Sequence, residues 1–260
     1  MIVVSIFYAG HPVLLALLFV GTCVGFSLAG LLISKRYVAK ESLEISKDGI
    51  IAYMNVVALL FAVLLAFLVI AVWENYEKNQ NNVSDEANYL GSLYRNINTL
   101  PDTMRIEFHK ELEAYKTAVV TIEWFSMEKG NDAKEVRQVI VQVFNSIAKY
   151  DKTNERRDII FGEVYKEFNA MFDCRRNRLI ACGENLPSVL WLVLIMGMVA
   201  TIFFSYYFYI EPFKVHIIFT VVLGIVIGLT LFLVFILEHP FHEPWKISSD
   251  VFEKVHLIVE

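Results

Sequence analysis

The chain contains four long stretches without an Asp, Glu, Lys or Arg side chain, and these constrain its fold more than any other feature. They cover residues 12–34, 49–73, 187–210 and 215–237. About 20 apolar residues are enough to cross the hydrocarbon core of a bilayer as a helix. Since lipid offers no partner for backbone polar groups, a stretch that spans it must satisfy them internally. The sequence therefore predicts an all-α membrane protein with four transmembrane helices.

The charged residues concentrate between the second and third stretches. Residues 74–186 hold 16 Lys and Arg and 19 Asp and Glu side chains. Apolar residues recur there at helical spacing, as in Leu90, Leu93 and Ile97, which predicts three or four amphipathic helices. The expected organisation is a first transmembrane pair in residues 1–73, a polar helical domain in 74–186, a second transmembrane pair in 187–237 and a C-terminal tail in 238–260.

Helix breakers predict where the polar helices begin and end. No proline lies between Trp73 and Pro101, so we expect the second transmembrane helix to continue beyond the membrane. Pro101 suits the first turn of a new helix. Further breaks are expected at residues 130–132 and near residues 150–153.

Small residues at four-residue spacing occur in two of the spans. Gly21, Gly25 and Ala29 lie in the first, and Gly224 and Gly228 in the fourth. Such spacing lets two helix backbones approach closely in lipid. We expect both stripes to serve helix packing.

Composition and motifs disfavour several classes of protein. The net charge of −5 gives no basic surface for nucleic acid. Phosphate-binding loops, nucleophile elbows and zinc-protease motifs are missing, so we expect neither an enzyme nor a cofactor. His239, His242 and Glu243 can each ligate a metal ion, but no Cys or second histidine pair accompanies them, and we expect no metal site.

A series of short motifs runs through most of the chain in a characteristic order. They are Asp48-Gly49, Leu64-Leu65-Ala66-Phe67, Trp73-Glu74, Glu86-Ala87, Leu93-Tyr94-Arg95, Leu100-Pro101, Tyr115, Glu123-Trp124, Arg178, Pro187, Trp191, Gly197 and Pro240-Phe241. From about Leu31 to Phe252 this series resembles the bacterial bestrophin-like family, long catalogued as a membrane domain of unknown function. That family is distantly similar to the bestrophin ion channels.

The resemblance implies an architecture and a function. Bestrophins are ring-shaped oligomers in which four spans per subunit surround a cytoplasmic helical domain, and the second span lines the pore with a narrow apolar neck. By this resemblance we expect self-association into a ring that passes small inorganic ions through a lipid bilayer. The sequence departs from bestrophins in lacking an obvious acidic cluster like their calcium clasp, which puts calcium gating in doubt.

If the second span lines a pore, one stripe at helical spacing faces it: Leu60, Leu64, Phe67, Ala71 and Glu74. Apolar side chains that narrow a lumen gate it by dewetting, and acids at its mouth favour cations. Asn55 is the only strongly polar side chain of this span, and such groups tend to face a bundle interior. The predicted pore-lining residues are therefore Asn55, Leu60, Leu64, Phe67 and Glu74. The alternative is that the stripe faces lipid or sister helices.

Two charged sets lie in the polar domain. Arg175, Arg176 and Arg178 form a basic cluster that is a candidate contact for anions or lipid headgroups, or an orientation anchor. Glu86 is expected to form a buried structural ion pair with Arg95 or with Arg178.

Orientation does not follow from charge. Lys35, Arg36, Lys40 and Lys47 lie in the first short loop, and the arginine cluster on the opposite side nearly balances them. Free thiols favour a reducing compartment. With the resemblance, they predict a cytoplasmic polar domain in a bacterial inner membrane. Two functions stay open: a homo-oligomeric ion channel, or a non-conducting scaffold or stress sensor whose helical domain docks a soluble partner.

Overall fold

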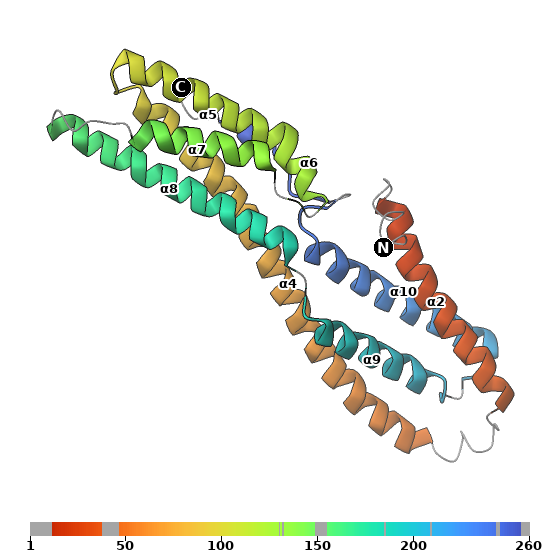
Figure 1. Cartoon of the computed structure of the whole chain (residues 1–260). Coiled ribbons are helices and arrows are strands. Elements are labelled where there is room, and N and C mark those ends of the chain that lie inside the picture. Colours follow the sequence, from red (N-terminus) through yellow and green to blue (C-terminus); the bar gives the residue numbers. More distant parts are fainter. Residues whose placement is uncertain are drawn as a thin grey trace. The chain divides into compact units, whose positions relative to one another are not determined.

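A computed structural model describes residues 12–37, 47–129, 131, 133–148, 155–184, 186–208, 210–242 and 245–255. Within these ranges the regular structure is entirely helical, and four helices are long and apolar enough to cross a membrane (Figure 1). The prediction of an all-helical protein with four long apolar helices is therefore confirmed.

The four apolar helices are α2 (Pro12–Tyr37), α4 (Lys47–Ile97), α9 (Ser188–Ser205) and α10 (Phe213–Glu238). As expected, α4 continues without a break far beyond Trp73. By contrast, α9 ends at Ser205, five residues before the predicted end of that span, because the chain turns at Tyr206 and Tyr207.

The remaining helices come from the polar part of the chain and its tail. They are α5 (Asp102–Ala118), the π-helix η1 (Val119–Glu123), α6 (Trp124–Met127), α7 (Lys134–Ala148), α8 (Glu155–Gly183) and α11 (Asp250–Glu253). Pro101 has an extended ψ of 147° and directly precedes α5, as the sequence predicts. The break between α6 and α7 also agrees with expectation, whereas the one predicted near residues 150–153 lies outside the described ranges.

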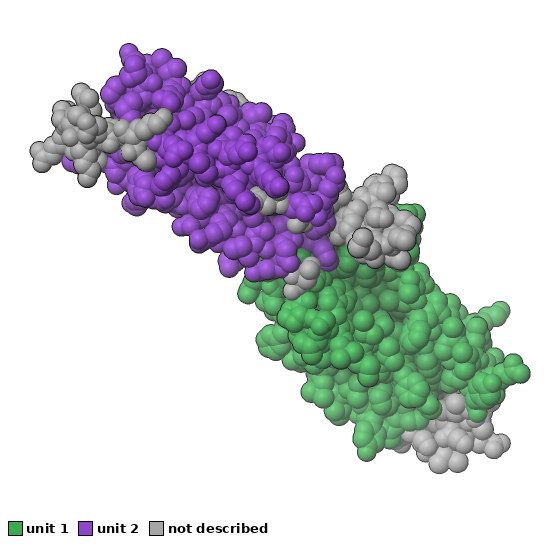
Figure 2. Space-filling view, viewed as in Figure 1, with its two compact units in different colours: residues 1–75, 185–238 green, residues 76–184, 239–260 purple. Residues whose placement is uncertain are grey.

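The chain divides into two compact units (Figure 2). The apolar unit comprises residues 1–75 and 185–238, and the polar unit comprises residues 76–184 and 239–260. The tail, expected to be a separate region, contributes Phe241, Ile247 and Phe252 to the core of the polar unit.

Glycines set the closest helix contact of the apolar unit. A Cβ at Gly228 of α10 would lie 2.7 Å from the Cα of Val20 in α2, and one at Gly224 would lie 3.0 Å from the Cα of Val24. The stripe of the fourth span therefore packs α10 directly against the backbone of α2. The stripe of the first span does not pack in this way, because Gly21 and Gly25 have no heavy atom within 4 Å of such a Cβ.

Aromatic rings cover two other glycines of this unit. The ring of Phe61 in α4 occupies the space where Gly197 of α9 would carry a Cβ, and the Tyr206 phenol does the same at Gly30 of α2. These contacts fix one face of α4 against α9 and attach the end of α9 to α2.

The polar unit has a conventional apolar core. The last part of α4 contributes Leu90, Leu93 and Ile97, and α5 adds Phe108 and Leu112, all of them buried. Because these residues recur every three or four positions, each helix presents one apolar stripe to the others. Burial of these stripes stabilises the unit without any contribution from lipid.

The glycine contact between α2 and α10 predicts that a Gly→Ala substitution lowers stability at Gly228 but not at Gly21. Gly228→Ala places a methyl group against backbone atoms, so we expect the free energy of unfolding to fall by about 1–3 kcal/mol. Gly21→Ala is the matched control, since its methyl group enters open space. Thermal unfolding of the purified protein in detergent measures both. Equal stability of the two variants would contradict the packing.

Candidate functional site

The outer face of α4 carries most of the predicted pore-lining residues. Leu60, Leu64 and Phe67 are each more than half exposed in the single chain, and Glu74 is exposed as well. Their spacings of four, three and seven residues keep them within roughly 80° around a helix of 3.6 residues per turn. The described helices therefore leave a continuous apolar stripe with an acid at its end uncovered.

Asn55 does not share this stripe. It is exposed, but it precedes Leu60 by five residues, which places it about 140° away around the helix. The five residues predicted to line a pore thus occupy two different faces of α4. Within a membrane the Asn55 amide needs a hydrogen-bond partner, and the apolar side chains of the stripe offer none.

The chain covers little of α4. Only 6% of the most apolar 18-residue stretch of this helix is buried, compared with 33% for α10. On another side of this helix, Phe61 packs against Gly197 of α9, and Val72 is buried. So much apolar surface is stable only against hydrocarbon or against other protein.

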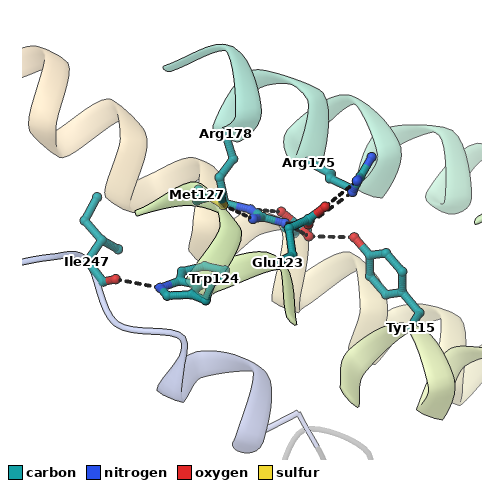
Figure 3. A network of polar contacts seen from close by, with 8 residues as sticks. Tyr115, Glu123, Trp124, Met127, Arg175, Arg178 and Ile247 are labelled. Carbon is teal, nitrogen blue, oxygen red and sulfur yellow. Dashed lines mark hydrogen bonds and ion pairs between the residues drawn. The ribbon is translucent and has the colours of Figure 1, made fainter. Parts of the chain in front are cut away.

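The polar unit contains a buried network of charged side chains centred on Arg178 of α8 (Figure 3). Its Nε and Nη2 atoms each donate to one oxygen of Glu86 in α4, both at 2.8 Å. Nη2 also donates to Oε2 of Glu123 at 2.8 Å. The bidentate contact between Arg178 and Glu86 is the strong form of an arginine–carboxylate pair.

Further groups complete the network. Arg175 forms an ion pair with Glu123, in which its Nε donates to Oε2 at 3.2 Å. The hydroxyl of Tyr115 donates to Oε1 of Glu86 at 2.6 Å, and the Arg178 guanidinium lies 4.7 Å from the ring centre of Trp124. Two carboxyl groups thus face two guanidinium groups, and each has a partner despite its burial.

Electrostatics fix the charge state of the central arginine. Burial acts to lower the pKa of Arg178, but the carboxylates of Glu86 and Glu123 outweigh it and raise that pKa above its ordinary value. Burial and the charge of Glu86 raise the pKa of Tyr115, so its phenol stays neutral and donates. The network joins α4, α5, η1 and α8 as a structural clamp.

The π-helix η1 supplies the Glu123 carboxylate of this network. It ends at Glu123, and Trp124 starts the next α-helical turn. A π-turn adds one residue to the helical repeat and so changes the direction of the side chains that follow it. Here Glu123 points at both arginines, and the Trp124 indole donates to the carbonyl of Ile247 at 3.1 Å (Figure 3).

The structure selects one of the two partners predicted for Glu86 and corrects the role predicted for the arginines. Glu86 pairs with Arg178 and not with Arg95, because nine residues along one helix separate Glu86 from Arg95 by about 13 Å. Arg95 instead donates to Oγ of Ser92 at 3.2 Å. In addition, Arg175 and Arg178 are buried and so are not open to anions or lipid headgroups.

Arg176 is the exposed member of the basic cluster. Its side chain is 61% exposed and pairs with Asp173 at 3.3 Å. Sequence reasoning missed the pairing of Arg175 with Glu123, since 52 residues separate them and no periodicity links them. Among the described residues, no group of three His, Cys, Asp or Glu side chains is placed to hold a metal ion.

The chain is similar to known proteins over nearly its whole length. A family model described as a Bestrophin-like domain matches residues 21–252. No curated protein matches. Among solved structures, a tryptophan-to-alanine variant of a bacterial bestrophin homologue from Klebsiella pneumoniae is similar with a TM-score of 0.69 at 13% identity, over 97% of this chain and 98% of that chain. The structure of that homologue solved by zinc SAD phasing gives 0.68 at 12% identity, over 94% and 96%.

The buried network predicts a large loss of stability when one partner is removed. Arg178→Met leaves two buried carboxyl groups without their shared partner, so we expect the free energy of unfolding to fall by about 3–5 kcal/mol. Arg176→Met is the control, because an exposed pair contributes only about 0–1 kcal/mol. Denaturant unfolding followed by the fluorescence of the protein measures both. A similar small change in the free energy of unfolding of the two variants would contradict a structural role for the buried network.

Proposed function

The chain belongs to the bestrophin-like family, and on this basis we propose that it is a subunit of a homo-oligomeric ion channel whose pore is lined by α4. The observation that carries the proposal is the outer face of α4, apolar at Leu60, Leu64 and Phe67 and uncovered by the chain's own helices. Copies of the chain arranged in a ring would bring these faces together around one axis.

The proposed topology has two membrane crossings on each side of the polar domain. α2 and the first part of α4 cross before it, and α9 and α10 cross after it. This order is supported by the positions of the four apolar helices along the chain. We place the protein in a bacterial cytoplasmic membrane with residues 74–186 in the cytoplasm, since Cys174 and Cys182 are both free thiols.

Leu60, Leu64 and Phe67 would form the neck of the pore. Rings of apolar side chains resist wetting when the lumen is narrow, which makes such a neck a gate. Glu74 follows two turns after Phe67 and would place a ring of carboxylates at one mouth. Carboxylate rings attract cations, so the proposal favours a cation-selective pore.

Reconstitution tests the channel directly. Purified protein in liposomes should pass small ions, measured by an ion-flux dye at several pH values with and without calcium. Native mass spectrometry of the same preparation should give a closed ring of four or more subunits. Absence of flux together with a monomer or an open dimer would instead support a non-conducting scaffold.

Two neighbouring leucines provide a matched test of the neck. Leu60 and Leu59 are 63% and 65% exposed, but they point about 100° apart around α4. We expect Leu60→Ala to raise single-channel conductance or leak severalfold, as Phe67→Ala should, because each widens the neck. Leu59→Ala should leave the currents unchanged. Equal effects of Leu59→Ala and Leu60→Ala would remove this stripe from the pore.

The proposed position of Glu74 at the pore mouth leads to a separate prediction. Glu74→Gln should shift the reversal potential toward lower cation preference in a salt gradient, because it removes one negative charge per subunit. High ionic strength should reduce the difference from the wild type, since exposed charges are screened within about 10 Å at 0.1 M salt. An unchanged reversal potential would place Glu74 outside the conduction path.

A further inference from the structure

The apolar unit contains a groove that the proposed pore does not use. It lies between α2, α9 and α10 and has a volume of about 390 Å³. Its walls are Leu15, Leu18, Phe19, Thr22, Cys23, Trp191, Ile195, Met198, Leu231 and Phe235. The groove thus involves three of the four apolar helices and no residue of α4.

The groove offers few polar groups to an occupant. The Thr22 hydroxyl donates to the carbonyl of Leu18 in its own helix at 2.7 Å. The indole of Trp191 donates to Oε2 of Glu238 at 3.0 Å. A buried water needs two to four polar partners, so this groove does not hold ordered water. An extended peptide would also leave its backbone groups without partners.

The length of the groove suits a hydrocarbon chain. Its lining along α2 extends from Leu15 to Cys23, about 12 Å at a rise of roughly 1.5 Å per residue. A hydrocarbon chain carries no backbone polar groups, so it can lie along this length against apolar side chains of α2, α9 and α10 without losing hydrogen bonds.

One end of the groove carries polar groups suited to a membrane surface. Trp191 lies near the start of α9, and Glu238, which accepts its indole hydrogen bond, is the last residue of α10. The same carboxylate accepts the backbone N–H of Leu186 at 2.8 Å. Tryptophan side chains of membrane proteins are enriched at the level of the headgroups. A chain entering beside Trp191 would therefore have its polar end at the interface.

We propose that this groove binds one acyl chain of a bilayer phospholipid. The inference rests on the membrane placement of α2, α9 and α10 but not on ion conduction. An empty apolar space of this size would forfeit the dispersion contacts of its lining, and an acyl chain restores them.

Photolabelling tests the proposal. The full-length protein is reconstituted in phosphatidylethanolamine and phosphatidylglycerol vesicles that contain a phospholipid with a diazirine in one acyl chain. The protein is extracted in mild detergent, which removes loosely held lipid, and is then irradiated, and its peptides are mapped by mass spectrometry. We expect labels to concentrate on the groove-facing residues Leu18 and Met198 rather than on Leu17 and Leu192, which are exposed outside the groove.

Two threonines provide the matched variants. Thr22 lines the groove and Thr230 does not, yet each hydroxyl donates to the carbonyl four residues earlier, Leu18 and Val226 respectively. Thr22→Phe should fill the groove and lower its labelling severalfold, and Thr230→Phe should leave it unchanged. Met198→Trp fills the groove from α9 and provides a second variant if Thr22→Phe does not fold.

Two results would overturn the proposal. Equal labelling in the Thr22→Phe and Thr230→Phe proteins would mean contact with bulk lipid only. Crosslinks from a photoactivatable residue at position 18 to another subunit, or to residues 1–11, would mean that protein fills the groove. Ion flux is measured separately, so a protein that does not conduct but retains the labelled lipid would refute the channel and leave the acyl-chain site standing.

Discussion

The absence of hydrogen-bond partners in hydrocarbon is the constraint on which the apolar unit depends. It requires that each crossing segment satisfy its own backbone, and the four long charge-free stretches do so as helices. Lipid tails are as apolar as leucine, so burial of apolar surface does not drive these helices together. Close packing does so instead, and Gly224 and Gly228 permit it by placing α10 directly against the α2 backbone at Val24 and Val20. The same constraint explains why the Trp191 indole, near the start of α9, donates to Glu238 within this unit.

The polar unit follows different physics, since water is the alternative solvent for its side chains. Its apolar core forms by ordinary burial, and its buried charges require a separate explanation. Glu86, Glu123, Arg175 and Arg178 come from three regions of the chain, and each is neutralised by the others. Such a network contributes little net stability compared with apolar residues of the same volume, but it is satisfied in only one arrangement of the helices. We therefore interpret it as a device that fixes the relative position of α4, η1 and α8 within this unit.

Much of the fold could be predicted from sequence because it depends on local signals. Charge-free length defines the spans, and Pro101 marks a helix start through its own backbone geometry. Long-range pairing leaves no such signal. The spacing of Gly21 and Gly25 is the same as that of Gly224 and Gly228, yet among the described residues it is the second pair that meets a neighbouring helix. Likewise, nothing in one sequence decides that Glu86 pairs with Arg178, 92 residues away, or that a π-turn directs Glu123 toward the same guanidinium. The outer face of α4 could be predicted as a stripe, but its exposure depends on which helices cover the other side.

The apolar stripe of α4 and the groove between α2, α9 and α10 differ in shape, and shape influences what can cover them. The stripe at Leu60, Leu64 and Phe67 projects outward from a single helix, so an equivalent helix of another copy, or the lumen that such copies enclose, can face it along its length. The groove at Cys23 and Met198 is recessed between three helices and lined by apolar side chains. Helices fit projecting surfaces through ridges and grooves of side chains, whereas flexible hydrocarbon chains fill narrow recesses. Protein and lipid can therefore cover the same unit at once without competing for one surface.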